Sequence, residues 1–202
     1  HDEDALTVQE AALSMYRRLG VPEETILATQ SNLATTYSSL GRKEEASQMY
    51  REVYHGALGL LGEEHAHTLL TANNYANCLF ELRRFEEAKE LLRKVTPVAR
   101  RVLGEEDRLT IKMRWTYAEA LYLDPDATLD DLREAVATLE DAERIARRVF
   151  GGQHPLTVDT EKGVRVSRAK LRAREDAEPD VSAQELDAAE AAAAAAAGDG
   201  SG

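Results

Sequence analysis

The sequence repeats itself with a period of 42 residues. The segment LGEE at residues 61–64 recurs at residues 103–106, and the segment EEA at residues 44–46 recurs at residues 86–88. A period of this length is typical of arrays in which each unit is one supersecondary motif and stacked units share a continuous core. The repeat therefore favours a stacked architecture over a fold built around one central core.

Each period is predicted to fold as two antiparallel helices. Apolar residues follow i, i+3, i+4, i+7 spacing, which is the pattern of a helix that buries one face. One such stripe consists of Phe85, Ala88, Leu91, Leu92, Val95, Val98, Ala99, Val102 and Leu103. No segment alternates like a strand. The predicted fold class is all-α, a right-handed α-solenoid of antiparallel helix pairs. We expect helices at residues 3–19, 24–40, 43–61, 66–82, 85–103, 108–123, 129–150 and 155–174.

The repeat frame divides the chain into six segments. Three full repeats lie between two half-repeats, and the last half-repeat is expected to form a polar cap. The third repeat is five residues longer than the others, and its turn-forming residues near 124–128 predict an enlarged loop. The segments are residues 1–20 (second helix of an incomplete repeat), 21–62 (repeat 1), 63–104 (repeat 2), 105–151 (repeat 3), 152–174 (capping helix) and 175–202 (acidic, Ala-rich, low-complexity tail).

Alanine recurs where the two helices of a repeat are expected to cross. A larger side chain at such a crossing would overpack it, at a cost of ~1–3 kcal/mol. The alanine pairs occupy equivalent positions in successive repeats. Each pair is therefore predicted to set the distance between the two helices of its repeat. The pairs are Ala34 with Ala46, Ala76 with Ala88, and Ala118 with Ala135.

The chain resembles a tetratricopeptide array. Leu33-Ala34-x2-Tyr37 and Ala46-x3-Tyr50 follow the short signature of that family. The long period, the entry motif LGEEH at residues 61–65 and the Asn pair at residues 73–74 resemble the long-repeat branch typified by kinesin light chain. The resemblance covers residues 3–160 or so. It implies a non-catalytic protein-interaction array.

The resemblance also implies a concave groove, lined by the first helices, that holds extended peptides. At ~100° per residue, the candidate groove residues lie opposite the buried direction or at the family's Asn positions. Asn73 and Asn77 are predicted to bond a peptide backbone, and Trp115 and Tyr122 to act as apolar anchors. Two alternatives remain open: Asn32 and Asn74 could hold neighbouring helices together, and the aromatic side chains could pack on the next repeat. The candidates are Ser31, Asn32, Thr35, Asn73, Asn74, Asn77, Trp115, Glu119 and Tyr122.

Charge and composition restrict the class of partner. The net charge is −12, but eight acidic residues and no basic ones follow Arg174, which leaves 29 acidic against 25 basic residues in the rest. Neither part has the basic field of a nucleic-acid binder. No run approaches the ~18–20 apolar residues of a membrane span, and no signal peptide is visible. A protein or peptide partner is therefore predicted, with no nucleic acid and no membrane.

Cysteine usage and the first residue bear on the compartment. Cys78 is the only cysteine, so no intramolecular disulfide is expected and a reducing, cytoplasmic location is favoured. Cys78 itself is predicted to be a small buried helix residue. The chain does not begin with Met, which suggests a fragment or a processed protein.

No catalytic residue, metal or cofactor is predicted, so the chain is not expected to be an enzyme. His65 and His154 occupy the same repeat position, which favours a structural role at a helix start. Paired acids such as Glu86 and Glu87 lie where a helix dipole favours negative charge. We find no phosphate-binding loop and no nucleophile motif.

The predicted function is a scaffold that binds a peptide or helix segment of a partner protein. The alternative is an intramolecular regulatory or structural array of a larger multidomain protein, which the opening half-repeat supports. The basic last helix could be a solvated cap or a patch for an acidic partner. We also hypothesise that the acidic tail folds back on this helix.

Overall fold

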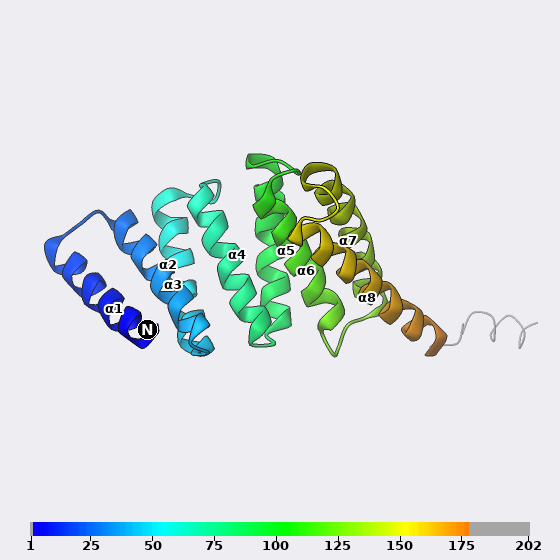
Figure 1. Cartoon of the computed structure of the whole chain (residues 1–202), viewed down its shortest axis with the longest axis horizontal. Coiled ribbons are helices and arrows are strands. Elements are labelled where there is room, and N and C mark those ends of the chain that lie inside the picture. Colours follow the sequence, from blue (N-terminus) through cyan, green and yellow to red (C-terminus); the bar gives the residue numbers. More distant parts are fainter. Residues whose placement is uncertain (1, 178–202) are drawn as a thin grey trace, which may run out of the picture.

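The chain folds into a row of helices. The computed structural model describes residues 2–177, in which there are eight helices and no strand (Figure 1). The predicted all-α class is confirmed, and each helix starts and ends within three residues of its expected position. The helices are α1 (Asp2–Leu19), α2 (Glu23–Ser39), α3 (Lys43–Leu61), α4 (Ala66–Glu81), α5 (Phe85–Val102), α6 (Arg108–Leu123), α7 (Leu129–Phe150) and α8 (Pro155–Ala177).

Helices α2, α4, α6 and α8 are the first helices of their repeats, and α1, α3, α5 and α7 are the second helices. Each helix packs against the next one in the chain, so the molecule in Figure 1 extends from α1 at one end to α8 at the other. First helices also touch one another, α4 with α6 and α6 with α8. A central first helix therefore has neighbours on several sides. The acidic tail beyond Ala177 lies outside the described residues.

One repeat position caps three of the first helices. His65, Asp107 and His154 lie 42 and 47 residues apart at the starts of α4, α6 and α8. Each side chain accepts a hydrogen bond from a backbone N–H of the first turn, which satisfies a donor that has no partner within the helix. The predicted structural role of His65 and His154 is confirmed. The bonds are His67 N to His65 Nδ1 (3.2 Å), Leu109 N to Asp107 Oδ1 (2.8 Å) and Leu156 N to His154 Nδ1 (3.2 Å).

The turn between α4 and α5 contains an unusual backbone conformation. Gly41 has φ 77° in the turn between α2 and α3, and the residue 42 positions later is Arg83, with φ 60°. A residue with a Cβ in this left-handed region costs roughly 1–2 kcal/mol. The second repeat thus keeps the turn of the first repeat without its glycine.

The insertion in the third repeat is shared between a loop and a helix. The α4–α5 turn comprises residues 82–84, whereas residues 124–128 connect α6 to α7. The other inserted residues extend the start of α7, where Thr128 and Asp131 form a capping box. The predicted loop enlargement is therefore smaller than the full insertion.

Alanine contacts and aliphatic side chains form the core along the array. All six alanines of the predicted crossings are fully buried. Cys78 is buried as expected, and its Sγ donates to the carbonyl oxygen of Lys43 at 3.3 Å. The two largest clusters of buried residues overlap along the stack, so each repeat depends on its neighbours for burial.

Candidate binding surface

The first helices leave one stripe of side chains open. On α4 it consists of Leu70, Asn74, Asn77 and Glu81, whose i, i+4, i+7, i+11 spacing places them on one side of the helix. We call these residues and their repeat equivalents the first-helix stripe. It is most open on α2 and narrows on α6, where Thr116 is buried. The equivalents are Ala28, Asn32, Thr35 and Ser39 on α2, and Lys112, Thr116, Glu119 and Leu123 on α6.

This stripe is rotated relative to the predicted groove. Asn32, Thr35, Asn74, Asn77 and Glu119 belong to it. Three other candidates are buried, which corrects the expectation that they project into open space: Ser31, Asn73 (1 % exposed) and Tyr122.

Contacts between neighbouring first helices account for this burial in part. Lys170 of α8 donates to the carbonyl oxygen of Tyr122 on α6 at 2.8 Å, and its Nζ lies 5.9 Å from the Tyr122 ring centroid. The flank of α6 that carries Tyr122 therefore faces the next repeat. Tyr122 packs against that repeat, which was one of the alternatives left open by the sequence.

Trp115 also packs between neighbouring helices of the array. Its side chain is half-buried against the cluster that contains Ile111 and Leu156. The indole N–H is buried and has no hydrogen-bond partner within residues 2–177. Trp115 is thus fixed by packing between α6 and its neighbours rather than presented as a free anchor.

Asn77 connects two repeats. Its Oδ1 accepts a hydrogen bond from Thr116 Oγ1 at 2.9 Å, which ties α4 to α6. On α2, Thr35 Oγ1 donates to the carbonyl oxygen of Ser31 at 3.0 Å and lies 2.8 Å from the Tyr50 hydroxyl. Since the Thr35 hydroxyl has one proton, Tyr50 donates to it. Asn77 is half-buried and Thr35 is exposed, and both side chains also have hydrogen-bond partners within the array.

A pocket opens between α4 and α6 beside the stripe. Its volume is about 340 Å³, and it combines apolar, amide and basic side chains. Asn73 lies at this pocket, and its buried Oδ1 has no hydrogen-bond partner in the described part of the chain. The lining residues are Leu70, Asn73, Asn74, Asp107, Arg108, Leu109 and Lys112.

Among the residues of the first-helix stripe, Glu119 has a carboxyl group with a strongly shifted pKa. Burial raises the pKa of its carboxyl from 4.5 to about 7, and the negative charge of Asp159 on α8 adds to this effect. A hydrogen bond from Tyr122 and the charge of Lys162 act in the opposite direction. Burial, and next the charge of Glu119, also raise the pKa of Tyr122. Glu119 therefore exchanges a proton near neutral pH at the α6–α8 contact.

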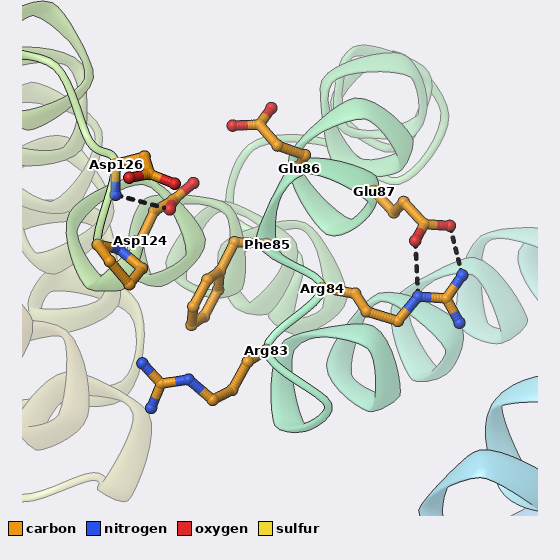
Figure 2. A pocket seen from close by; sticks show the side chains of 8 residues that line it. Arg83, Arg84, Phe85, Glu86, Glu87, Asp124 and Asp126 are labelled. Atoms are coloured by element: carbon orange, nitrogen blue, oxygen red, sulfur yellow. Dashed lines mark hydrogen bonds and ion pairs between the residues drawn. The ribbon is translucent and has the colours of Figure 1, made fainter.

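A second pocket lies at the turns that join α4 to α5 and α6 to α7. Figure 2 shows Asp124 and Asp126 on one side of it and Arg84 with Glu87 on the other, with the Phe85 ring between them. Arg84 donates two hydrogen bonds of 2.6 Å to Glu87. Asp126 N donates to Asp124 Oδ1 at 3.0 Å. The charges of Arg84, Glu87 and Asp124 already have partners, which favours a structural role for the pocket.

The sequence did not indicate a buried ion pair next to this pocket. Lys89 Nζ donates to Asp124 Oδ2 at 2.8 Å, and the two side chains are only 5 % and 7 % exposed. Lys89 also bonds Glu86. The signal that could have revealed the pair is a lysine on the core side of an amphipathic helix, next to Ala88, where apolar residues are normal.

Within residues 2–177, no group of three or more His, Cys, Asp or Glu side chains could hold a metal ion. In the same part of the chain, no helix has both the length and the apolar character needed to cross a bilayer.

Comparison with known proteins supports the repeat assignment. The family model for tetratricopeptide repeats matches residues 26–67 and 68–108. No curated protein matches the sequence. Among solved structures, a single-substitution variant of a Podosopora anserina protein assigned as a kinesin light chain, with nearly identical TPR-like repeats, has a TM-score of 0.73 at 21 % identity, over 87 % of this chain and 81 % of that one.

Two further solved structures have the same fold. A related structure of the Podosopora anserina repeats has a TM-score of 0.68 at 20 % identity, over 89 % of this chain and 90 % of that one. BtubC (BKLC) from P. vanneervenii has a TM-score of 0.67 at 18 % identity, over 89 % of this chain and 76 % of that one. Residues 26–108 therefore match the tetratricopeptide-repeat family, and the helical array has the fold of the kinesin light chain-like repeats in these solved structures.

Proposed function

We propose that the chain is a scaffold whose first-helix stripe binds a peptide or helical segment of a partner protein. Tetratricopeptide repeats generally mediate protein–protein interaction. The observation that carries the proposal is the exposed Leu70 beside Asn74 and the pocket between α4 and α6. An apolar side chain next to amide groups in a concave site suits recognition of a polypeptide.

The side chains at the pocket suggest what the partner segment contains. Asn74 offers both a donor and an acceptor to a peptide backbone. Leu70 and Leu109 supply apolar surface, and Lys112 supplies a positive charge. The carboxylate of Asp107 already accepts two backbone N–H bonds, so the basic groups are the charges left for a ligand. A segment with an apolar residue close to an acidic one fits this arrangement.

Asn73 is not the exposed binding residue that the sequence predicted. Its Oδ1 is buried without a partner among the described residues, and an unsatisfied buried acceptor costs roughly 1–3 kcal/mol. This oxygen is closed to the pocket, so an N–H group of a bound segment satisfies it only if the Asn73 amide reorients. The amides offered to a partner are therefore those of Asn74 and Asn77 on the first-helix stripe, and Asn73 lies behind them in the pocket wall.

The test begins with peptides selected from a random display library against the 202-residue chain. Leu70→Glu and Asn74→Ala are each expected to weaken binding of the selected peptides at least tenfold, since they remove apolar surface and an amide at the pocket. Val102→Glu is the control, because Val102 is also exposed but belongs to the second helix α5. Unchanged affinity in both stripe variants, or equal loss in the control, would contradict the proposal.

A further inference from the structure

Helix α8, the last helix of the described row (Figure 1), exposes the side that earlier first helices bury. Ile111 and Ala118 of α6 are fully buried, whereas their equivalents 47 residues later, Val158 and Arg165, are exposed. The exposed residues on this side follow i, i+4, i+7, i+11, i+14 spacing, so they share one side of the helix. We call them the α8 end face: Val158, Lys162, Arg165, Ala169 and Arg172.

The side chains of this face differ in kind from those of the earlier repeats. The equivalent of Arg165 is Ala118, which is buried in one cluster with Ala135 of α7. An arginine at such a crossing would overpack it and bury a charge. Another repeat of the same kind therefore cannot pack on this face, and its openness follows from its own basic side chains.

A groove between α7 and α8 adjoins this face. Its volume is about 680 Å³, and five arginines line it against three glutamates, so positive charge is in excess. Arg165 forms no ion pair within residues 2–177. The other four pair with carboxylates at the surface, but a guanidinium has five donors and can bond a second carboxylate as well. The arginines are Arg144, Arg147, Arg148, Arg165 and Arg168.

The groove between α5 and α6, one repeat earlier, shows how such a site is filled. Arg93 and Arg100 line it, and so does Glu134 of α7, the next helix in the chain. The Tyr117 hydroxyl donates to Glu134 Oε1 at 2.8 Å, and Arg93 Nε donates to the Tyr117 oxygen at 3.3 Å. The segment that follows this groove in sequence thus supplies a carboxylate to its basic side chains.

We propose that the acidic segment that follows α8 binds the α8 end face and the adjoining groove in the same way. Residues 178–202 contain six acidic residues and no Lys or Arg, so their charge is complementary to that of Arg165 and Arg172. The alanines of the segment are small apolar groups that suit Val158 and Ala169. The acidic residues are Glu178, Asp180, Glu185, Asp187, Glu190 and Asp199.

The length of the segment allows this contact. Arg165 lies ~18 Å from Ala177 along the helix axis, and an extended chain spans ~3.3 Å per residue. Roughly six residues beyond a turn therefore return the chain to Arg165. Because both parts belong to one chain, their effective concentration is in the millimolar range, so weak ion pairs are sufficient to hold the segment in place.

A spin label on the acidic segment of the 202-residue chain tests the proposal. In Ala189→Cys the label lies between Asp187 and Glu190, while the native thiol of Cys78 is buried with its pKa raised to about 11. The amide signal of Val158 is decisive, because it lies ~28 Å along the helix from Ala177. We expect the label to broaden it strongly at low salt, and the broadening to fall at least twofold at about 0.5 M NaCl.

Charge reversal separates this contact from a segment that does not bind. Arg165→Glu/Arg172→Glu should reduce the broadening of Val158 at least twofold. Arg18→Glu/Arg51→Glu is the matched control, since it makes the same charge change at exposed arginines of α1 and α3, and it should leave the broadening unchanged. Equal broadening in all three chains, or equal loss in both variants, would overturn the proposal.

A mixed sample separates contact within one chain from contact between copies. It combines isotope-labelled chain without a spin label and spin-labelled chain without isotope. We expect the Val158 signal to stay sharp in this mixture. Broadening there as strong as in the doubly labelled chain would assign the contact to a second copy and overturn the proposal. Far-UV circular dichroism checks that each variant is folded.

Discussion

At the scale of single residues, the backbone at Arg83 offers a direct test of the repeat geometry. Arg83 has φ 60° where the first repeat has Gly41. Arg83→Gly is therefore expected to raise the free energy of unfolding by about 1 kcal/mol, net of the extra freedom that glycine has in the unfolded chain. Urea denaturation measures the change.

A neighbouring residue provides the control for this substitution. Arg84 has an ordinary φ of −85° and forms an ion pair with Glu87, so Arg84→Gly should lower stability. If Arg83→Gly were no more stable than the original chain, the left-handed turn would not carry the strain assigned to it.

Glu119 makes stability depend on pH. Burial raises its pKa from 4.5 to about 7, so the folded chain holds this proton more tightly than the unfolded chain. Its contribution to stability is present in full below about pH 4.5 and is lost as the pH rises through about 7. At pH 8, Glu119→Gln should stabilise the chain by roughly 1–3 kcal/mol.

Urea denaturation of Glu119→Gln at pH 5 and pH 8 checks this expectation. The increase in the free energy of unfolding, relative to the original chain, should be clearly larger at pH 8 than at pH 5. An equal gain at both pH values would mean that the Glu119 carboxyl is not held protonated by its surroundings.

The site could be predicted from the sequence only in part, and Asn73 and Asn74 show why. The helical period identified which residues face the helix partner of the same repeat. It did not identify the flank that faces the next first helix, because that depends on how repeats stack. Asn73 consequently lies at a pocket wall and Asn74 on the open stripe. For the same reason Tyr122 is buried near α8.

At the scale of helices and loops, the pair of Lys89 on α5 and Asp124 after α6 links the second repeat to the third. Removing one partner leaves a buried charge uncompensated, which costs ~3–5 kcal/mol. Lys89→Met is expected to lower the free energy of unfolding by that amount. The double variant Lys89→Met/Asp124→Leu should recover most of the loss, as measured by a double-mutant cycle in urea. Additive losses would contradict the coupling.

The alanine crossings set the spacing of helix pairs. Ala76 is fully buried between helices, whereas Ser39 is exposed at the end of α2. Ala76→Leu should lower stability by ~1–3 kcal/mol through overpacking, and Ser39→Leu should have little effect. Thermal unfolding followed by circular dichroism compares them. Equal melting temperatures would mean that the repeat register is wrong.

Helix positions could be predicted from the sequence because apolar spacing and turn residues agree in every repeat. The third repeat was harder, since a length difference does not say which element receives the added residues. There Thr128 and Asp131 cap α7 early, so much of the insertion becomes helix. The pairing of Lys89 with Asp124 was also hidden, because the two residues are brought together only by stacking.

At the scale of the whole molecule, the array presents surfaces of different character. The first-helix stripe is open and combines amide, apolar and basic groups at the α4–α6 pocket. The end at α1 exposes the apolar side chains of Val8, Met15 and Leu19.

The central claim, that the first-helix stripe binds a polypeptide segment, can be measured through the asparagine side chains. The chain contains only four asparagines, Asn32, Asn73, Asn74 and Asn77, so their side-chain amide signals can be followed by NMR during titration with a selected peptide. We predict that the signals of Asn74 and Asn77 shift with the same saturation curve as binding. A peptide that binds while all four signals stay unchanged would contradict the account.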